Sequence, residues 1–110
     1  ETYTFLAVCW DLDLTNKKGL QKLNKLNEFA HENGYNFIAA TSTMSKVDSL
    51  VKENDLNFTF ISGDDKVLKT IVRSNPGVIV LKNGVILGKW GTKTIPNNKR
   101  MKKYLQKRDK

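Results

Sequence analysis

The fold is decided by one stretch, Arg73-Ser-Asn-Pro-Gly-Val-Ile-Val-Leu-Lys-Asn-Gly-Val-Ile-Leu-Gly-Lys-Trp90. Two apolar runs rich in β-branched residues, 78–81 and 85–87, flank an Asn-Gly pair, which tolerates the positive φ angles of a type I′ turn. The first run is apolar at four successive positions, as is typical of a strand with helices on both faces of its sheet. Pro76 precedes this strand, where a missing N–H costs no ladder bond and a cis bond is affordable. The stretch therefore predicts a β-hairpin that follows a proline turn.

The first half of the chain alternates between strand and helix patterns. Residues 2–10 are mostly apolar or β-favouring and predict a first strand, and residues 36–40 predict a second strand parallel to it. Apolar residues at three- and four-residue steps predict a helix that ends near Asn33, before Gly34, and another over residues 44–54. The first of these helices follows the cap residue types Thr15 and Asn16.

The second half continues the pattern. Residues 56–61 are a weaker candidate for an extended segment, after which Asp64 is expected to cap a short helix. Its apolar stripe is expected to hold Val67, Leu68, Ile71 and Val72. The last twelve residues place Met101, Tyr104 and Leu105 along one edge of a further short helix.

The resulting order, βαβα(α)ββα with a proline-led hairpin, resembles the thioredoxin fold over roughly residues 2–95. The resemblance implies an α/β three-layer sandwich, in which a mixed four-stranded sheet is flanked by helices and a cis Pro76 faces the active site. We expect one thioredoxin-like domain over residues 1–96 and a basic C-terminal helix or tail over residues 97–110.

A narrower resemblance covers residues 64–96, including the run Arg73-Ser-Asn-Pro-Gly and the pair Lys89-Trp90. These residues resemble the C-terminal soluble domain of DoxX-like membrane proteins from Bacteroides-type bacteria. The resemblance implies a water-facing module on the extracytoplasmic face of a bacterial membrane, with any redox or quinone-related chemistry in the missing membrane part. The start at Glu1, without a methionine, agrees with a domain taken from a longer protein.

Composition predicts a single folded domain. Of the 110 residues, 39% are hydrophobic and 27% are charged, and no apolar run approaches the roughly 18 residues that span a bilayer. The net charge of +8 is unevenly distributed, because residues 99–110 carry seven Lys or Arg and one Asp. The remaining residues are nearly balanced, with twelve Lys or Arg and ten Asp or Glu.

The single cysteine excludes dithiol–disulfide exchange by this domain alone. Such exchange needs a thiolate at the start of the first long helix and a second thiol three residues on, and those places fall near Thr15 and Lys18. Cys9 is expected to be a small buried side chain in the first strand. The alternative for Cys9 is an exposed nucleophile or mixed-disulfide site.

The proline turn is the candidate binding site. In thioredoxin-like proteins the backbone before the cis-proline can pair with an extended peptide. The resemblance implies that Asn75, with Arg73 and Pro76 beside it, offers this backbone. The opposite lip would be formed by Thr15, Asn16, Lys17 and Lys18. The alternative is that the residues before Pro76 only make the sharp turn that the fold needs.

No other constellation in the sequence indicates catalysis, a metal or a cofactor. His31 has no second histidine to complete a metal set and suits the end of its helix. The acids Asp11, Asp13, Asp64 and Asp65 are expected to act as caps in solvent. The class of enzyme, if any, stays open.

The basic end allows three interpretations: a solvated tail, a contact with anionic lipid, and a nucleic-acid site. The candidate contact residues of this end are its cations Lys99, Arg100, Lys102, Lys103, Lys107 and Arg108. Nucleic acid is the least favoured, because the end carries a single aromatic residue and the rest of the domain is nearly neutral. A lipid contact gains about 1 kcal/mol for each cation near an anionic surface.

We therefore expect a non-catalytic interaction or scaffolding module with an unnamed protein or peptide partner. The alternatives are an accessory domain of a membrane-associated thiol or quinone system and a basic adaptor for a lipid surface.

Overall fold

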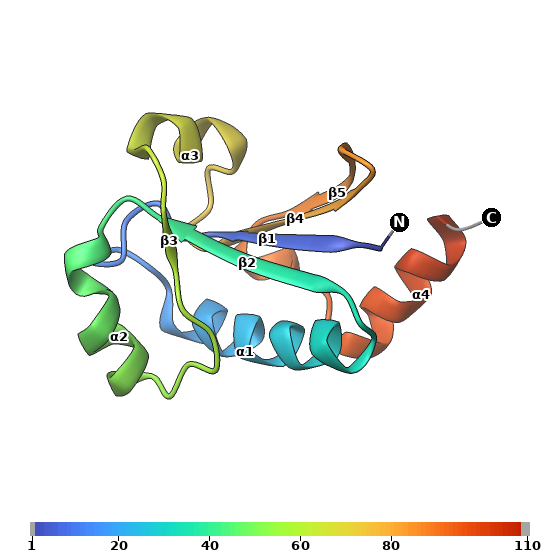
Figure 1. The fold of residues 1–110 in the computed structure, drawn as a ribbon, viewed down its shortest axis with the longest axis horizontal. Helices are drawn as coiled ribbons and strands as arrows, with labels where there is room; N and C mark the ends of the chain where they lie inside the picture. Colours follow the sequence, from blue (N-terminus) through green and yellow to red (C-terminus); the bar gives the residue numbers. More distant parts are fainter. Residues whose placement is uncertain (1, 109–110) are drawn as a thin grey trace.

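A computed structural model describes residues 2–108. Helices lie on both sides of a central sheet (Figure 1). The described residues form five strands: β1 (Thr4–Val8), β2 (Asn36–Thr41), β3 (Ile61–Ser62), β4 (Gly77–Lys82) and β5 (Val85–Trp90). The helices are α1 (Lys17–Glu32), α2 (Val47–Glu53), α3 (Asp65–Ile71) and α4 (Asn98–Arg108), with 3₁₀ turns η1 (Met44–Lys46) and η2 (Thr92–Thr94).

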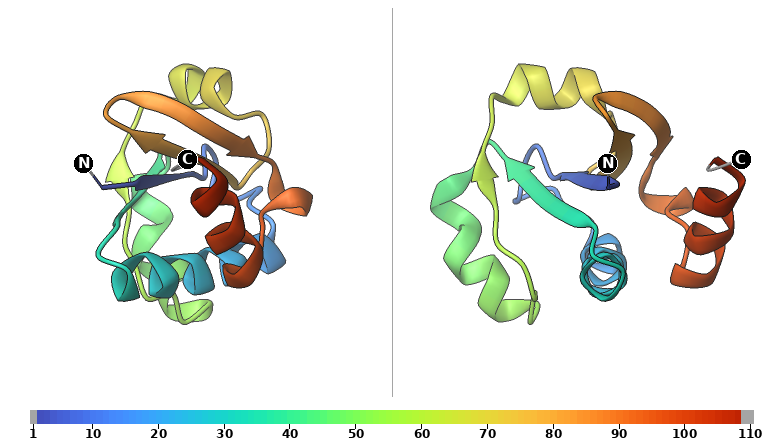
Figure 2. Two further views of the ribbon diagram at one scale, coloured as in Figure 1. Left: turned by 90° about the vertical axis from the view of Figure 1, so that its right-hand side faces the viewer. Right: turned by 45° about the vertical axis from the view of Figure 1, so that its right-hand side comes forward.

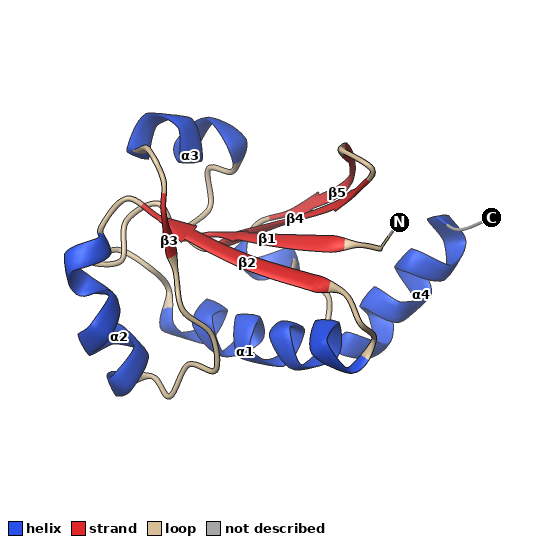
Figure 3. Cartoon of the chain, viewed as in Figure 1, coloured by secondary structure: helices blue, strands red, loops and turns tan. Residues whose placement is uncertain are grey.

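The sheet is mixed, and its strand order is β3-β2-β1-β4-β5 (Figure 3). Strand β1 is parallel to β2 and antiparallel to β4, and β4 and β5 form the expected hairpin. In its turn Asn83 and Gly84 both have positive φ angles, 54° and 77°, as a type I′ turn requires. The predicted α/β sandwich and hairpin are confirmed.

The expected number of strands is wrong by one, because the weak segment at 56–61 ends in β3. This strand pairs through two residues alone, Ile61 with Ala40 and Ser62 with Thr41. The preceding residues are held toward α1 instead, since the Asn57 N–H donates to Asn24 Oδ1 at 2.9 Å and Asn27 Nδ2 donates to the Asn57 carbonyl at 3.1 Å. Pairing with β2 is therefore short.

Two apolar cores lie on the two faces of the sheet. Helix α1 covers one face and α3 the other (Figures 1 and 2). Along β4, Val78 and Val80 belong to the core on the α1 side, and Ile79 belongs to the core on the α3 side. The run of four apolar residues that indicated a doubly covered strand is explained by this alternation.

Helix boundaries follow the caps. The Asn16 side chain accepts from the Gly19 N–H at the start of α1, and the Asp64 side chain accepts from the Val67 N–H at the start of α3. The expected apolar stripe of α3 is partly wrong, because Val67 is 56% exposed. With seven residues, α3 turns one narrow face to the sheet, and that face holds Leu68 and the following Val72.

The basic C-terminal residues form α4, which packs against the rest of the protein. Met101 and Leu105 are buried in the same core as α1. The Tyr3 hydroxyl donates to the Leu105 carbonyl at 3.3 Å, and the Tyr104 hydroxyl donates to the Leu87 carbonyl. The side chain of Arg108 and residues 109–110 lie outside the described part of the chain.

Candidate binding groove beside Pro76

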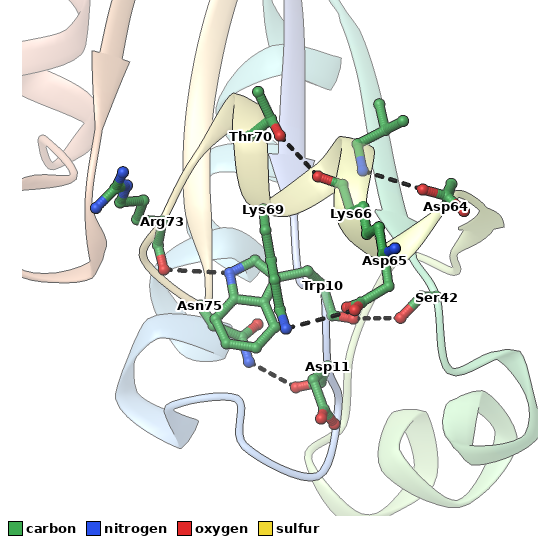
Figure 4. A network of polar contacts seen from close by, with 11 residues as sticks. Trp10, Asp11, Ser42, Asp64, Asp65, Lys66, Lys69, Thr70, Arg73 and Asn75 are labelled. Atoms are coloured by element: carbon green, nitrogen blue, oxygen red, sulfur yellow. Dashed lines mark hydrogen bonds and ion pairs between the residues drawn. The ribbon is translucent and has the colours of Figure 1, made fainter.

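The segment 73–76 is fixed in place by its carbonyl groups. The Asn75–Pro76 bond is cis. Trp10 Nε1 donates to the Arg73 carbonyl at 3.2 Å (Figure 4), and the Asn16 N–H donates to the Asn75 carbonyl at 3.1 Å. The Thr92 hydroxyl donates to the Pro76 carbonyl at 2.6 Å. These bonds come from the loop between β1 and α1 and from η2, so two separate parts of the chain hold the segment.

The side chain of Asn75 joins this segment to the loop between β1 and α1. Its amide Nδ2 donates to the Asp11 carbonyl at 2.6 Å (Figure 4). Its Oδ1 lies 2.9 Å from the Thr15 hydroxyl, which is also 2.8 Å from the Asp11 carbonyl. The single hydroxyl proton is shared between these two acceptors. The two loops therefore form one hydrogen-bonded unit.

Two adjoining cavities open at this end of the molecule. The larger measures about 570 Å³ and is lined by Trp10, Leu14, Asn16, Ser74, Asn75, Gly91, Thr92, Lys93 and Thr94. The smaller measures about 340 Å³ and is lined by Thr70, Ile71, Val72, Arg73, Ser74, Lys89, Trp90 and Gly91. Ser74 and Gly91 belong to both. We call the two cavities together the proline groove.

The structure brings together some of the sequence-predicted site residues. Asn16 and Asn75 line the larger cavity, and Arg73 lines the smaller one. Thr15 contacts Asn75 directly, so it supports the segment. Pro76 is fully buried and presents no side-chain surface.

Two predicted residues stand apart from the groove. Lys17 and Lys18 are exposed on the first turn of α1 and line neither cavity. The expected dithiol register also shifts by one residue, because the helix cap is Asn16 and its bonded partner one turn on is Gly19. A thiol pair at a helix start would therefore occupy positions 16 and 19, in place of the expected Thr15 and Lys18.

Several groove residues were missed by the sequence analysis. Leu14 is 66% exposed at the rim of the larger cavity, and Trp10 lines the same cavity. Residues 91–94 form the far wall of that cavity. The available signal was two leucines in a polar loop, Leu12 and Leu14, of which only Leu12 is buried.

Gly19 allows the close approach of α1 to the proline segment. A Cβ at this position would lie 2.7 Å from both Cδ and Cγ of Pro76, and 3.1 Å from Cγ2 of Thr92. The lack of a side chain is therefore required by packing. It explains a glycine in the first turn of a helix, where glycine is otherwise unfavourable by roughly 0.5–1 kcal/mol relative to alanine.

Cys9 is chemically shielded. Its side chain is fully buried in the core on the α1 side. Burial raises the pKa of the Cys9 thiol to about 12, because the thiolate would lose its hydration. The expectation of a buried Cys9 is confirmed, and at neutral pH the thiol is protonated.

Three of the acids singled out in the sequence have a cap role or a charged partner. The Asp64 side chain accepts from the Val67 N–H, as predicted, and Asp65 forms an ion pair with Lys69 at 3.4 Å (Figure 4). Asp13 lies 3.9 Å from the Lys46 ammonium. Within residues 2–108, no three His, Cys, Asp or Glu side chains gather as a metal site requires.

The fold is thioredoxin-like, and the solved structures most similar in shape include thiol–disulfide oxidoreductases. The chain is similar to a thiol-disulfide oxidoreductase from Bacteroides fragilis NCTC 9343, with a TM-score of 0.71 and 16% identity, over 96% of this chain and 80% of that one. StoA from Bacillus subtilis gives a TM-score of 0.67 and 16% identity, over 94% and 82%. A secreted Mycobacterium tuberculosis disulfide oxidoreductase, homologous to E. coli DsbE, gives 0.62 and 15%, over 96% and 81%.

At these identities the similarity establishes the fold alone. No family model matches the sequence, and no curated protein matches it. This chain has one cysteine and no Cys-x-x-Cys pair. Among the helices of residues 2–108, none combines the length and apolar character needed to cross a bilayer.

Proposed function

We propose that this domain is a non-catalytic, thioredoxin-like module that binds an extended segment of another protein in the proline groove. The proposal rests on one observation, the hydrogen bonding of the Arg73–Asn75 backbone. Its Arg73 and Asn75 carbonyls are bonded within the domain, whereas the Asn75 N–H finds no acceptor among the described residues. A peptide carbonyl would supply that acceptor, as in the addition of a strand to an exposed backbone.

The hydrogen bonds that restrain the loops around Pro76 favour peptide binding. Fixing a loop in its binding conformation before the partner arrives lowers the entropy lost on association. Here Trp10, Asn16 and Thr92 already restrain the segment through side-chain and backbone bonds. Leu14 adds an exposed apolar side chain at the rim, suited to contact an apolar residue of the partner.

We further propose that the domain is the water-facing part of a DoxX-like membrane protein, on the extracytoplasmic side. The support is the resemblance of residues 64–96, together with the secreted nature of one structural neighbour. In this proposal the domain scaffolds a partner, and redox or quinone-related chemistry belongs to the membrane part. Direct participation of Cys9 is disfavoured by its burial.

A panel of three peptides tests the binding function. The probes are short, N-acetylated and C-amidated, share one central leucine, and carry Glu, Gln or Lys at the alternate flanking positions. Amide shifts in ¹H–¹⁵N spectra should change at the groove residues Trp10, Ser74, Asn75 and Gly91 with at least one peptide. No change with any of the three would overturn the proposal.

A matched pair of variants locates the binding. Leu14→Ser removes a side chain that is 66% exposed at the groove rim, and Val85→Ser removes one that is 59% exposed in the hairpin. Leu14→Ser should weaken the best peptide several-fold, and Val85→Ser should leave its affinity unchanged. Equal losses would place the binding outside the groove.

The lipid-surface alternative has one observation in its favour. Helix α4 is docked through Met101 and Leu105, and its exposed cations include Lys99, Arg100, Lys102, Lys103 and Lys107. Three of them line a shallow cavity of about 230 Å³ beside Tyr104. Salt-sensitive binding to phosphatidylserine vesicles, absent with phosphatidylcholine vesicles, would support this second role.

A further inference from the structure

The charges that line the proline groove are all positive. Its cations are Arg73 and Lys89 around the smaller cavity and Lys93 at the larger one. No Asp or Glu lines either cavity in the described part of the chain. The first turn of α1 likewise has no acid, while Lys17 and Lys18 are exposed there. The lining residues therefore produce a positive potential over the groove.

The nearest acids reduce this potential only in part. Asp13 lies beside the Lys46 ammonium, and the Asp11 carboxylate accepts from the Asp13 N–H at 2.9 Å. Asp65 pairs with Lys69, whose ammonium also lies 4.8 Å from the centre of the Trp10 ring. The Asp13–Lys46 and Asp65–Lys69 pairs are each neutral overall, whereas the Asp11 charge remains and opposes only part of the potential of the three lining cations (Figure 4).

The backbone hydrogen bonds of residues 73–76 also favour a ligand rich in acceptors. Three carbonyls of the proline segment, those of Arg73, Asn75 and Pro76, accept bonds from the domain. The N–H groups of Arg73, Ser74 and Asn75 donate none within residues 2–108. The segment therefore offers donors and few free acceptors, so it is better suited to a ligand rich in acceptors.

We propose that the segment bound in the proline groove is acidic: an extended peptide with carboxylate side chains facing Arg73, Lys89 and Lys93. A central apolar side chain would pack against Leu14 and Trp10, and a peptide carbonyl would accept from the Asn75 N–H. This inference rests on the proposed binding function and names the class of partner. Charges at a rim mainly raise the association rate and exclude partners of the wrong sign.

The peptide panel described above separates the two proposals. We expect the Glu peptide to bind about tenfold more tightly than the Gln peptide at low salt, since three rim ion pairs contribute modestly and additively. The Lys peptide should bind most weakly. The advantage of the Glu peptide should shrink as ionic strength rises, because salt screens exposed charges. The blocked C-terminus ensures that side-chain carboxylates are the source of any preference.

Charge reversal gives the matched control. Lys93→Glu at the groove should abolish most of the preference for the Glu peptide, whereas Lys25→Glu, an equal charge change at an exposed position of α1 outside the groove, should preserve it. Equal binding of the three peptides would overturn the acidic preference while the binding function stands. Tighter binding of the Lys peptide would also overturn it, and binding of none would remove the function itself.

Discussion

At the scale of single residues, the alternation of side chains just beyond the end of β1 separates a buried thiol from the candidate binding groove. Cys9 and Trp10 are adjacent in sequence, yet Cys9 belongs to the core on the α1 side and Trp10 packs on the α3 side. Successive side chains of an extended chain point to opposite faces. Trp10 can therefore hold the Arg73 carbonyl while Cys9 is withdrawn from any partner that docks in the proline groove.

The buried thiol predicts a loss of stability at high pH. The unfolded chain releases the Cys9 proton near its ordinary pKa of 9.0, whereas the folded chain keeps it up to about 12. The folded state therefore binds more protons in this window, so the stabilisation is complete below pH 9 and is lost as pH rises toward 12. The slope is about 1.4 kcal/mol per pH unit for one proton.

The measurement is urea unfolding from pH 8 to 11 for the wild type and Cys9→Ala. All other side chains are the same in the two proteins, so the difference between their free energies of unfolding isolates the thiol. We expect that difference to be constant below pH 9 and to move against the wild type above it. Parallel curves throughout would show that the thiol is accessible to ionisation in the folded state.

Which site residues could be predicted from the sequence depended on how local their signal was. Asn75 and Asn16 were predicted from the thioredoxin resemblance, supported by the proline beside Asn75 and by the cap chemistry of Asn16. Leu14 was missed because single exposed leucines are common on protein surfaces. Lys17 and Lys18 line neither cavity, and a helix start that differs by one residue rotates the side chains about 100° around the axis, so their direction could not be set from the sequence.

At the scale of elements, the decisive contact joins α1 to the segment that leads into β4. Helix α1 begins at Lys17, and two residues later its backbone lies against the buried ring of Pro76. The same helix start supplies the Asn16 N–H to the Asn75 carbonyl. The position of α1 and the shape of the groove are therefore coupled through one residue without a side chain, Gly19.

Replacement of that residue tests the coupling. Gly19→Ala should gain up to about 1 kcal/mol of helix propensity and lose about 1–3 kcal/mol through overpacking against Pro76 and Thr92. We expect a net destabilisation of about 1 kcal/mol, seen as a melting temperature lower by roughly 4–8 °C. The neighbouring exposed Lys18→Ala should change stability by less than about 0.5 kcal/mol. A Gly19→Ala protein more stable than the wild type would contradict this packing.

Elements were predictable where one strong local pattern agreed with the tertiary structure. The apolar run of β4 and its Asn-Gly turn fixed the hairpin, because burial on both faces and positive φ angles each leave a clear mark in sequence. Strand β3 was not counted as part of the sheet. The extent of its pairing with β2, two residue pairs, depends on the hydrogen bond from Asn57 to α1, and local sequence does not reveal a contact between residues so far apart in the chain. Val67 follows the helical period, but α3 is too short to bury it.

At the scale of the whole molecule, the fold resembles that of oxidoreductases while the place for a thiol pair is closed. A thiolate at the N-cap of a helix is stabilised by the N–H groups of the first turn. Here the N-cap is Asn16, and the N–H that bonds to its side chain is that of Gly19. A second thiol at position 19 would need a Cβ where the Pro76 ring lies, 2.7 Å away. Packing against Pro76 therefore opposes a thiol pair at these positions, in addition to the presence of a single cysteine in the sequence.

Two cysteine variants test this whole-molecule argument. Asn16→Cys alone should give a thiol that reacts readily with a labelling reagent, because a helix start lowers a thiol pKa. The double variant Asn16→Cys with Gly19→Cys should be less stable than the wild type, and should reduce insulin disulfides no faster than the wild type, for which we expect no turnover above buffer. Helix spacing does not prevent a disulfide between these positions, because they have the three-residue spacing of the Cys-x-x-Cys motif. The experiment therefore tests whether steric conflict with Pro76 prevents a working thiol pair. Turnover by the double variant like that of an active thioredoxin would show that the fold still accommodates the pair and would contradict this argument.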